Sequence, residues 1–121
     1  MSIQVPPFPG TDNSITLEEA VFMTQTYRGN NEKILDPQYQ DKMILPFSET
    51  FNREAFDKLL GQAGCEGIRL YYGMDDKLQV HIIAVAVNDR NEDMLDGSNS
   101  ILVENGVRCP IACPPPSILN S

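Results

Sequence analysis

Two β-rich runs separated by a short polar break constrain the fold of this chain more than any other feature. The runs cover residues 67–73 and 78–88, and the break contains Asp75 and Asp76, which tolerate the left-handed backbone of turns. Residues 82–87 are apolar at every position, as in a strand that is covered on both faces. The pattern predicts an antiparallel hairpin whose second strand lies in the middle of a sheet.

A first helix is predicted near the N-terminus. Thr16 and Glu19 have capping-box spacing, so the hydroxyl and the carboxylate can each accept a hydrogen bond from an amide at the helix start. Apolar residues then recur at helical spacing as far as Tyr27, and Gly29 follows as a stop. We expect a helix over 17–28 with one narrow apolar face.

A second helix is predicted over 53–63. Asn52 stands at its N-cap, and Phe51 and Phe56 have the spacing of a hydrophobic staple. A wider apolar stripe follows, and Gly64 has the place of a left-handed cap. We expect the stripe to face the hairpin through Phe56, Leu59 and Leu60.

Proline dominates both ends of the chain. Residues 1–14 contain Pro6, Pro7 and Pro9 and are expected to form an extended arm, and residues 105–121 an irregular tail rich in cysteine and proline. Residues 43–47 suit an edge strand or an ordered loop, and 101–103 one more short strand. The 121 residues therefore predict a single α+β domain, 1–121, with an antiparallel sheet of three or four strands, two helices packed against it and extended termini.

The charge limits the classes of partner. Seventeen acidic residues against nine basic ones give a net charge of −8, which repels nucleic acid and anionic lipid. No basic and apolar leader opens the chain, and no run of eighteen apolar residues occurs. Three cysteines are too few for the disulfide framework of a small secreted domain. We expect an acidic cytoplasmic protein without nucleic-acid or membrane partners.

The cysteines and the single histidine allow a zinc site. Cys109 and Cys113 have a spacing close to that of zinc knuckles, and Cys65 with His81 would complete a tetrahedral set. Because Cys65 and His81 have no paired spacing of their own, we predict no cofactor and keep zinc as an alternative. In the favoured interpretation Cys65 is a small buried apolar residue, and the other two cysteines are free thiols or a redox-dependent bridge.

Two further ligand or catalytic patterns are incomplete. Cys65 and His81 could form a thiol nucleophile and its base, but no local signature surrounds either residue. Asp89, Asn91 and Asp93 repeat the first positions of a calcium loop, whose later glycine and glutamate are replaced. The sequence leaves enzymatic activity open and favours a non-enzymatic role.

Several segments follow one another in a recognisable order: the second predicted helix, residues 64–73, residues 85–93, and the closing Cys109-Pro110 and Cys113-Pro114. This succession resembles a family of short uncharacterised proteins common in Bacteroidetes, which has no assigned activity. The resemblance spans most of residues 15–121. It implies that these residues form one domain, and it transfers no mechanism.

The leading functional hypothesis is a non-enzymatic cytoplasmic interaction or assembly protein, which binds itself as a homodimer or binds an unknown protein. Arg69 and Tyr71 lie on one face of the first hairpin strand and are of the types that interfaces favour. The alternatives are the zinc protein above and a small-molecule binding protein or enzyme with a pocket near Tyr71, Tyr72 and His81.

Overall fold

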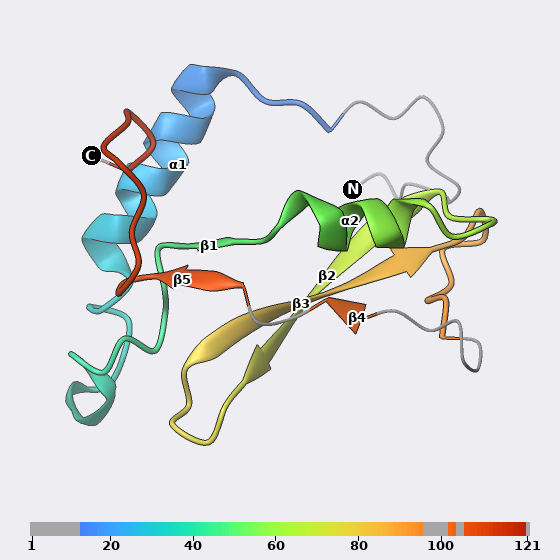
Figure 1. Cartoon of the computed structure of the whole chain (residues 1–121). Helices are drawn as coiled ribbons and strands as arrows, with labels where there is room; N and C mark the ends of the chain where they lie inside the picture. Colours follow the sequence, from blue (N-terminus) through green and yellow to red (C-terminus); the bar gives the residue numbers. More distant parts are fainter. Residues whose placement is uncertain (1–12, 96–101, 104–105, 121) are drawn as a thin grey trace. The chain divides into compact units, whose positions relative to one another are not determined.

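The computed structural model of the chain describes residues 13–95, 102–103 and 106–120. These residues form an α+β fold with two α-helices and two small antiparallel sheets (Figure 1). The contacts divide the chain into two compact units: unit 1 includes Phe51–Gly73 and Ile82–Gly106, and unit 2 includes Asn13–Thr50, Met74–His81 and Val107–Ser121. The predicted arm lies outside the described residues except for 13 and 14. The single domain stays a prediction.

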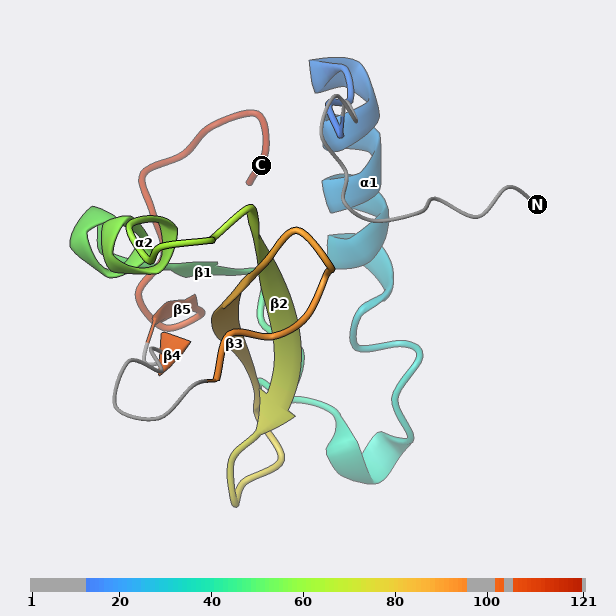
Figure 2. The ribbon, with the colours of Figure 1, turned by 90° about the vertical axis from the view of Figure 1, so that its right-hand side faces the viewer.

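A three-stranded sheet of order β2-β3-β4 comprises β2 (Gly67–Met74), β3 (Val80–Val87) and β4 (Leu102–Val103) (Figure 2). All of its residues belong to unit 1 except the hairpin end, Met74, Val80 and His81, which belongs to unit 2. β4 is antiparallel to β3, with Val103 opposite Ala84. The hairpin and the central place of its second strand are thus confirmed. Ile101, the first residue of the third predicted strand, lies outside the described residues.

The hairpin turn has a different left-handed residue from the one that the sequence predicts. The carboxylate of Asp75 accepts backbone hydrogen bonds from Lys77 at 2.8 Å and Gln79 at 3.0 Å. The positive φ, 64°, occurs at Leu78. Asp75 and Asp76 lie in the predicted turn, but neither has the left-handed backbone that they tolerate, and the side chain of Asp75 instead closes the turn by accepting two hydrogen bonds.

Helix α2 (Arg53–Leu60) packs its apolar stripe against the sheet. Leu59 is fully buried and forms the core of unit 1 with Ala84, Ala86 and Val103. Phe51 and Phe56 form the predicted staple, with ring centroids 5.6 Å apart. Leu60 is 55% exposed, so its expected place in the core is wrong.

The end of α2 explains the exposure of Leu60. The helix stops at Leu60 instead of residue 63, and Gly61 is its C-cap, with an amide that donates to the carbonyl of Asp57 at 2.8 Å. Gly61 has a φ of −79°, so the helix ends there without a left-handed residue. Gly64 does take a left-handed backbone, with φ of 90°, but beyond the helix end.

Unit 2 joins helix α1 (Leu17–Asn30) to a two-stranded antiparallel ribbon, β1 (Ser48–Thr50) with β5 (Val107–Cys109). The predicted capping box is present, because the hydroxyl of Thr16 accepts from the amide of Glu19 at 3.0 Å and the Glu19 side chain accepts from the Thr16 amide. A 3-10 turn, η1 (Pro37–Tyr39), follows the helix.

Strand β5 corrects the prediction that residues 105–121 are irregular throughout. Val107, Arg108 and Cys109 lie before the first proline of the tail, so their amides remain available for strand pairing. Residues 43–47 form an ordered loop ahead of β1. The guanidinium of Arg108 fixes this loop, since it donates to the carbonyls of Met43 at 2.8 Å and Val80 at 2.9 Å.

Candidate functional site

A cavity of about 860 Å³ lies in unit 2 between α1, the β1–β5 ribbon and the tail that follows β5. The apolar part of its described lining consists of Met23, Tyr27, Phe47, Leu119, the three prolines 114–116 and the two cysteines 109 and 113. Neutral polar side chains stand among them: Thr24, Ser48, Thr50, Ser117 and Asn120. A volume of this size falls within the range of about 300–1,000 Å³ that is usual for sites of drug-sized ligands.

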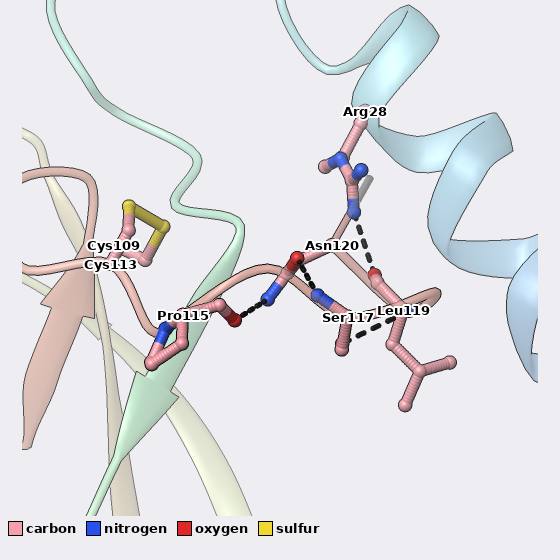
Figure 3. Close-up of a disulfide and its surroundings, with 7 residues drawn as sticks. All are labelled: Arg28, Cys109, Cys113, Pro115, Ser117, Leu119 and Asn120. Carbon is pink, nitrogen blue, oxygen red and sulfur yellow. Dashed lines mark hydrogen bonds between the residues drawn. A yellow bond between two sulfur atoms is a disulfide. The ribbon is translucent and has the colours of Figure 1, made fainter.

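The tail forms one wall of the cavity and holds its own shape through hydrogen bonds between residues close in the chain (Figure 3). The side chain of Asn120 accepts from the amide of Ser117 at 2.7 Å and donates to the carbonyl of Pro115 at 3.0 Å. The hydroxyl of Ser117 accepts from the amide of Leu119 at 3.2 Å. These bonds and the fixed φ angles of the prolines give the wall a defined form.

Arg28 links the segments that line the cavity. Figure 3 shows its guanidinium directed from α1 to the carbonyl of Leu119, to which it donates a hydrogen bond of 2.6 Å. Its Cζ also lies 5.8 Å from the centroid of the Phe47 ring, within the range of a cation–π contact. Arg28 therefore ties the helix both to the tail and to the segment before β1.

A disulfide joins Cys109 to Cys113 in the lining of the same cavity. Cys109 is buried as the last residue of β5 and lies opposite Ser48 of β1, and its carbonyl accepts from the amide of Phe47 at 2.6 Å. Cys113 is exposed and directly precedes the three prolines 114–116. The bridge thus fastens the start of the tail to the ribbon.

The four predicted zinc ligands have other contacts. Cys109 and Cys113 are close together, but as a disulfide they offer no thiolate. Cys65, in unit 1, is half-buried, and its Sγ lies 3.4 Å from the carbonyl oxygen of Gly67. His81, in unit 2, is bonded to Asp75. In the described part of the chain, no three acidic, cysteine or histidine residues are grouped to hold a metal, and zinc stays the untested alternative.

His81 and Asp75 close the end of the hairpin. His81 Nε2 lies 2.8 Å from Asp75 Oδ2, and this bond, with the backbone amides of Gln79 and Lys77, lowers the pKa of Asp75. The other ring nitrogen, Nδ1, is buried and has no hydrogen-bond partner among the described residues. In this arrangement the histidine holds the turn, and its remaining nitrogen is enclosed instead of presented to a substrate.

Unit 1 carries a polar network of Arg69, Tyr71, Asn91 and Asp93. The guanidinium of Arg69 donates to the carboxylate of Asp93 and, at 3.1 Å, to the carbonyl of Asn91, while the hydroxyl of Tyr71 donates to Asp93. The bond from Tyr71, with the neighbouring Arg69, lowers the pKa of Asp93, and the same bond raises the pKa of Tyr71. Asn91 and Asp93, which have the spacing of the first residues of a calcium loop, therefore direct oxygen atoms to the guanidinium of Arg69. The predicted interface at Arg69 and Tyr71 stays a prediction.

The hydrogen bond between Tyr71 and Asp93 should stabilise the fold only over a limited range of pH. A carboxyl with a lowered pKa stabilises the fold above about pH 4 and loses this effect as the pH falls through its folded pKa. A tyrosine with a raised pKa stabilises below about pH 10 and loses this effect as the pH rises through its folded pKa. The difference in urea midpoint between wild type and Tyr71→Phe should therefore vanish in acid and in alkali.

The matched control for this series is Tyr39→Phe. Tyr39 lies in η1, outside β2, and its hydroxyl has no hydrogen bond among the described residues, so removal of the hydroxyl should leave the midpoint unchanged at every pH. A Tyr71→Phe difference that stays constant from acid to alkali would show that the hydroxyl bond to Asp93 does not stabilise the protein.

The cavity was not predicted from the sequence, although some of its lining residues belong to segments that were. Tyr27 belongs to the predicted apolar face of the first helix, and the prolines belong to the predicted irregular tail. The lining forms only because β1 pairs with β5, whose partner residues lie 57 to 61 positions apart in the chain, from Thr50 with Val107 to Ser48 with Cys109. None of Tyr71, Tyr72 and His81 belongs to the described lining.

Comparison of the chain with family models, with curated proteins and with solved structures gives no match. Among the described residues, neither helix has the length and apolar character needed to span a membrane.

Proposed function

We propose that this protein binds a compact, largely apolar ligand in the cavity of unit 2. The observation that carries the proposal is the cavity itself, whose volume of about 860 Å³ and mainly apolar lining, with a few hydroxyl and amide groups and the guanidinium of Arg28, are those of a ligand site. The apolar walls would supply most of the affinity through burial of ligand surface. The hydroxyl groups of Ser48 and Thr50 offer the neutral hydrogen bonds that orient a bound molecule.

The test uses a neutral apolar fluorescent probe, N-phenyl-1-naphthylamine, titrated with the oxidised protein. We expect saturable binding of one probe per chain. Thr24→Phe adds a ring at the cavity wall and should weaken binding at least tenfold, because the added ring occupies the ligand's volume.

Gln25→Phe is the matched control for this test. Gln25 is the next residue of α1, is exposed and does not belong to the described lining, so its replacement should leave the affinity unchanged. Equal affinities for the two variants, or no saturable binding by wild type, would exclude the cavity as the site.

A second candidate function is that of a non-enzymatic interaction or assembly protein, acting on a second copy or on another protein. It is favoured by the apolar side chains that β2 exposes: Leu70 at 50%, Tyr72 at 80% and Met74 at 61%. We keep the cytoplasm as the proposed location. There the Cys109–Cys113 bridge would exchange with cellular thiols.

A further inference from the structure

Strand β2 is the outer strand of its sheet. It pairs with β3 on one side, and on its other side no strand pairs with it among the described residues. Natural edge strands are usually short or carry proline, lysine or a bulge that prevents pairing with another chain. β2 has eight residues without proline or lysine, and its one charged residue, Arg69, is bound to Asp93. Its open backbone edge is thus suited to accept another strand.

The side chains of β2 form an apolar row on one face: Ile68, Leu70, Tyr72 and Met74. Ile68 packs on the core that α2 covers, whereas the other three are at least half exposed. The row therefore continues from the core of unit 1 to the uncovered end of the strand. A partner strand at this edge would extend the same row with side chains of its own.

We propose that two copies of the chain pair antiparallel through β2, about a two-fold axis normal to the sheet at Tyr71. In this register Leu70 lies opposite Tyr72 of the second copy, and Ile68 lies opposite Met74 of the second copy. Arg69 lies opposite Gly73 of the second copy, so no like charges face each other. The two sheets of three strands become one continuous sheet of six, and both open edges are closed.

The apolar row selects this register. A two-fold axis normal to the sheet places the same face of both copies on the same side of the joined sheet. Each residue must therefore pair with a residue of the same face, so the two residue numbers are both even or both odd. With Tyr71 on the axis, all four apolar residues of one copy meet all four of the other. With Leu70 on the axis, Met74 would face Glu66, beyond the end of β2. The inference is independent of the cavity and gives the second candidate function a specific interface.

Cysteine pairing tests the register. In a Cys65→Ser background, chains with Leu70→Cys are mixed with chains with Tyr72→Cys and oxidised. Directly opposite Cβ atoms of an antiparallel pair are about 4.5–5.5 Å apart and diagonal ones about 7–8 Å, whereas a disulfide needs about 3.5–4.5 Å. We expect cross-linked dimers in the mixture and only background levels in each variant alone. Equal cross-linking in the separate variants would overturn the register.

Sedimentation equilibrium at micromolar concentration tests the dimer itself. Wild type is expected at twice the chain mass of 13.5 kDa. Tyr72→Lys should lower the association constant at least tenfold, because the lysine would face the apolar Leu70 of the second copy. Phe22→Lys, at a residue of α1 that is 69% exposed, should leave the association unchanged. A wild type at 13.5 kDa, or equal loss in both variants, would overturn the proposal.

Discussion

Leu59→Ala is expected to lower the free energy of unfolding by about 2–5 kcal/mol, the usual cost of a cavity left by a buried leucine. Leu59 is the largest residue in the core that α2 shares with the sheet, and it is fully buried. Its neighbours Ala84 and Ala86 have side chains too small to fill the space it would leave. The measurement is the urea midpoint together with the slope of the unfolding transition.

Leu60→Ala provides the control for this substitution. The same atoms are removed from the next residue of α2, but Leu60 is 55% exposed, so we expect a change within about 0.5 kcal/mol. Equal losses for the two variants would mean that the core of unit 1 is not centred on Leu59.

Reduction of the Cys109–Cys113 bridge is expected to have the second largest effect. The two cysteines are separated by four positions, and the chain-entropy model gives about 2 kcal/mol of stabilisation for a ring of this size. Reduction also releases the start of the tail from β5, and the tail lines the cavity. We therefore expect a lower melting temperature and a several-fold weaker affinity for the neutral probe.

Cys113→Ser should reproduce both effects in oxidising buffer, whereas Cys65→Ser should reproduce neither, because Cys65 belongs to unit 1 and has no part in the bridge. If the reduced protein bound the probe as tightly as the oxidised one, the bridge would have no role in shaping the ligand site.

The sequence allowed prediction of the elements that depend on local patterns. The capping box at Thr16, the staple of Phe51 and Phe56 and the two β-rich runs of the hairpin each involve residues close in the chain, and all three features are present in the structure. The error at Leu60 is also local, because two glycines, 61 and 64, compete to end α2 and the stripe alone does not decide between them.

The candidate site was less predictable because it depends on pairings between distant segments. Ser48–Thr50 and Val107–Cys109 are three residues each, too short for a periodic signal, yet their pairing brings Phe47 and the tail together around the cavity. The bond between Arg69 and Asp93 was likewise not predictable, because the chain contains many other acidic and basic residues with which either side chain could have paired. Such contacts are properties of the folded chain and not of any one segment.

The most direct test of the proposed ligand site is a methyl NMR spectrum of protein labelled at the methionine methyl groups, recorded during titration with the neutral probe. Met23 lines the cavity of unit 2, and Met74 stands in the exposed row of β2. The proposal predicts that the Met23 signal shifts with saturation while the Met74 signal does not move. A shift at Met74 without one at Met23, or a titration that leaves Met23 unchanged, would contradict it.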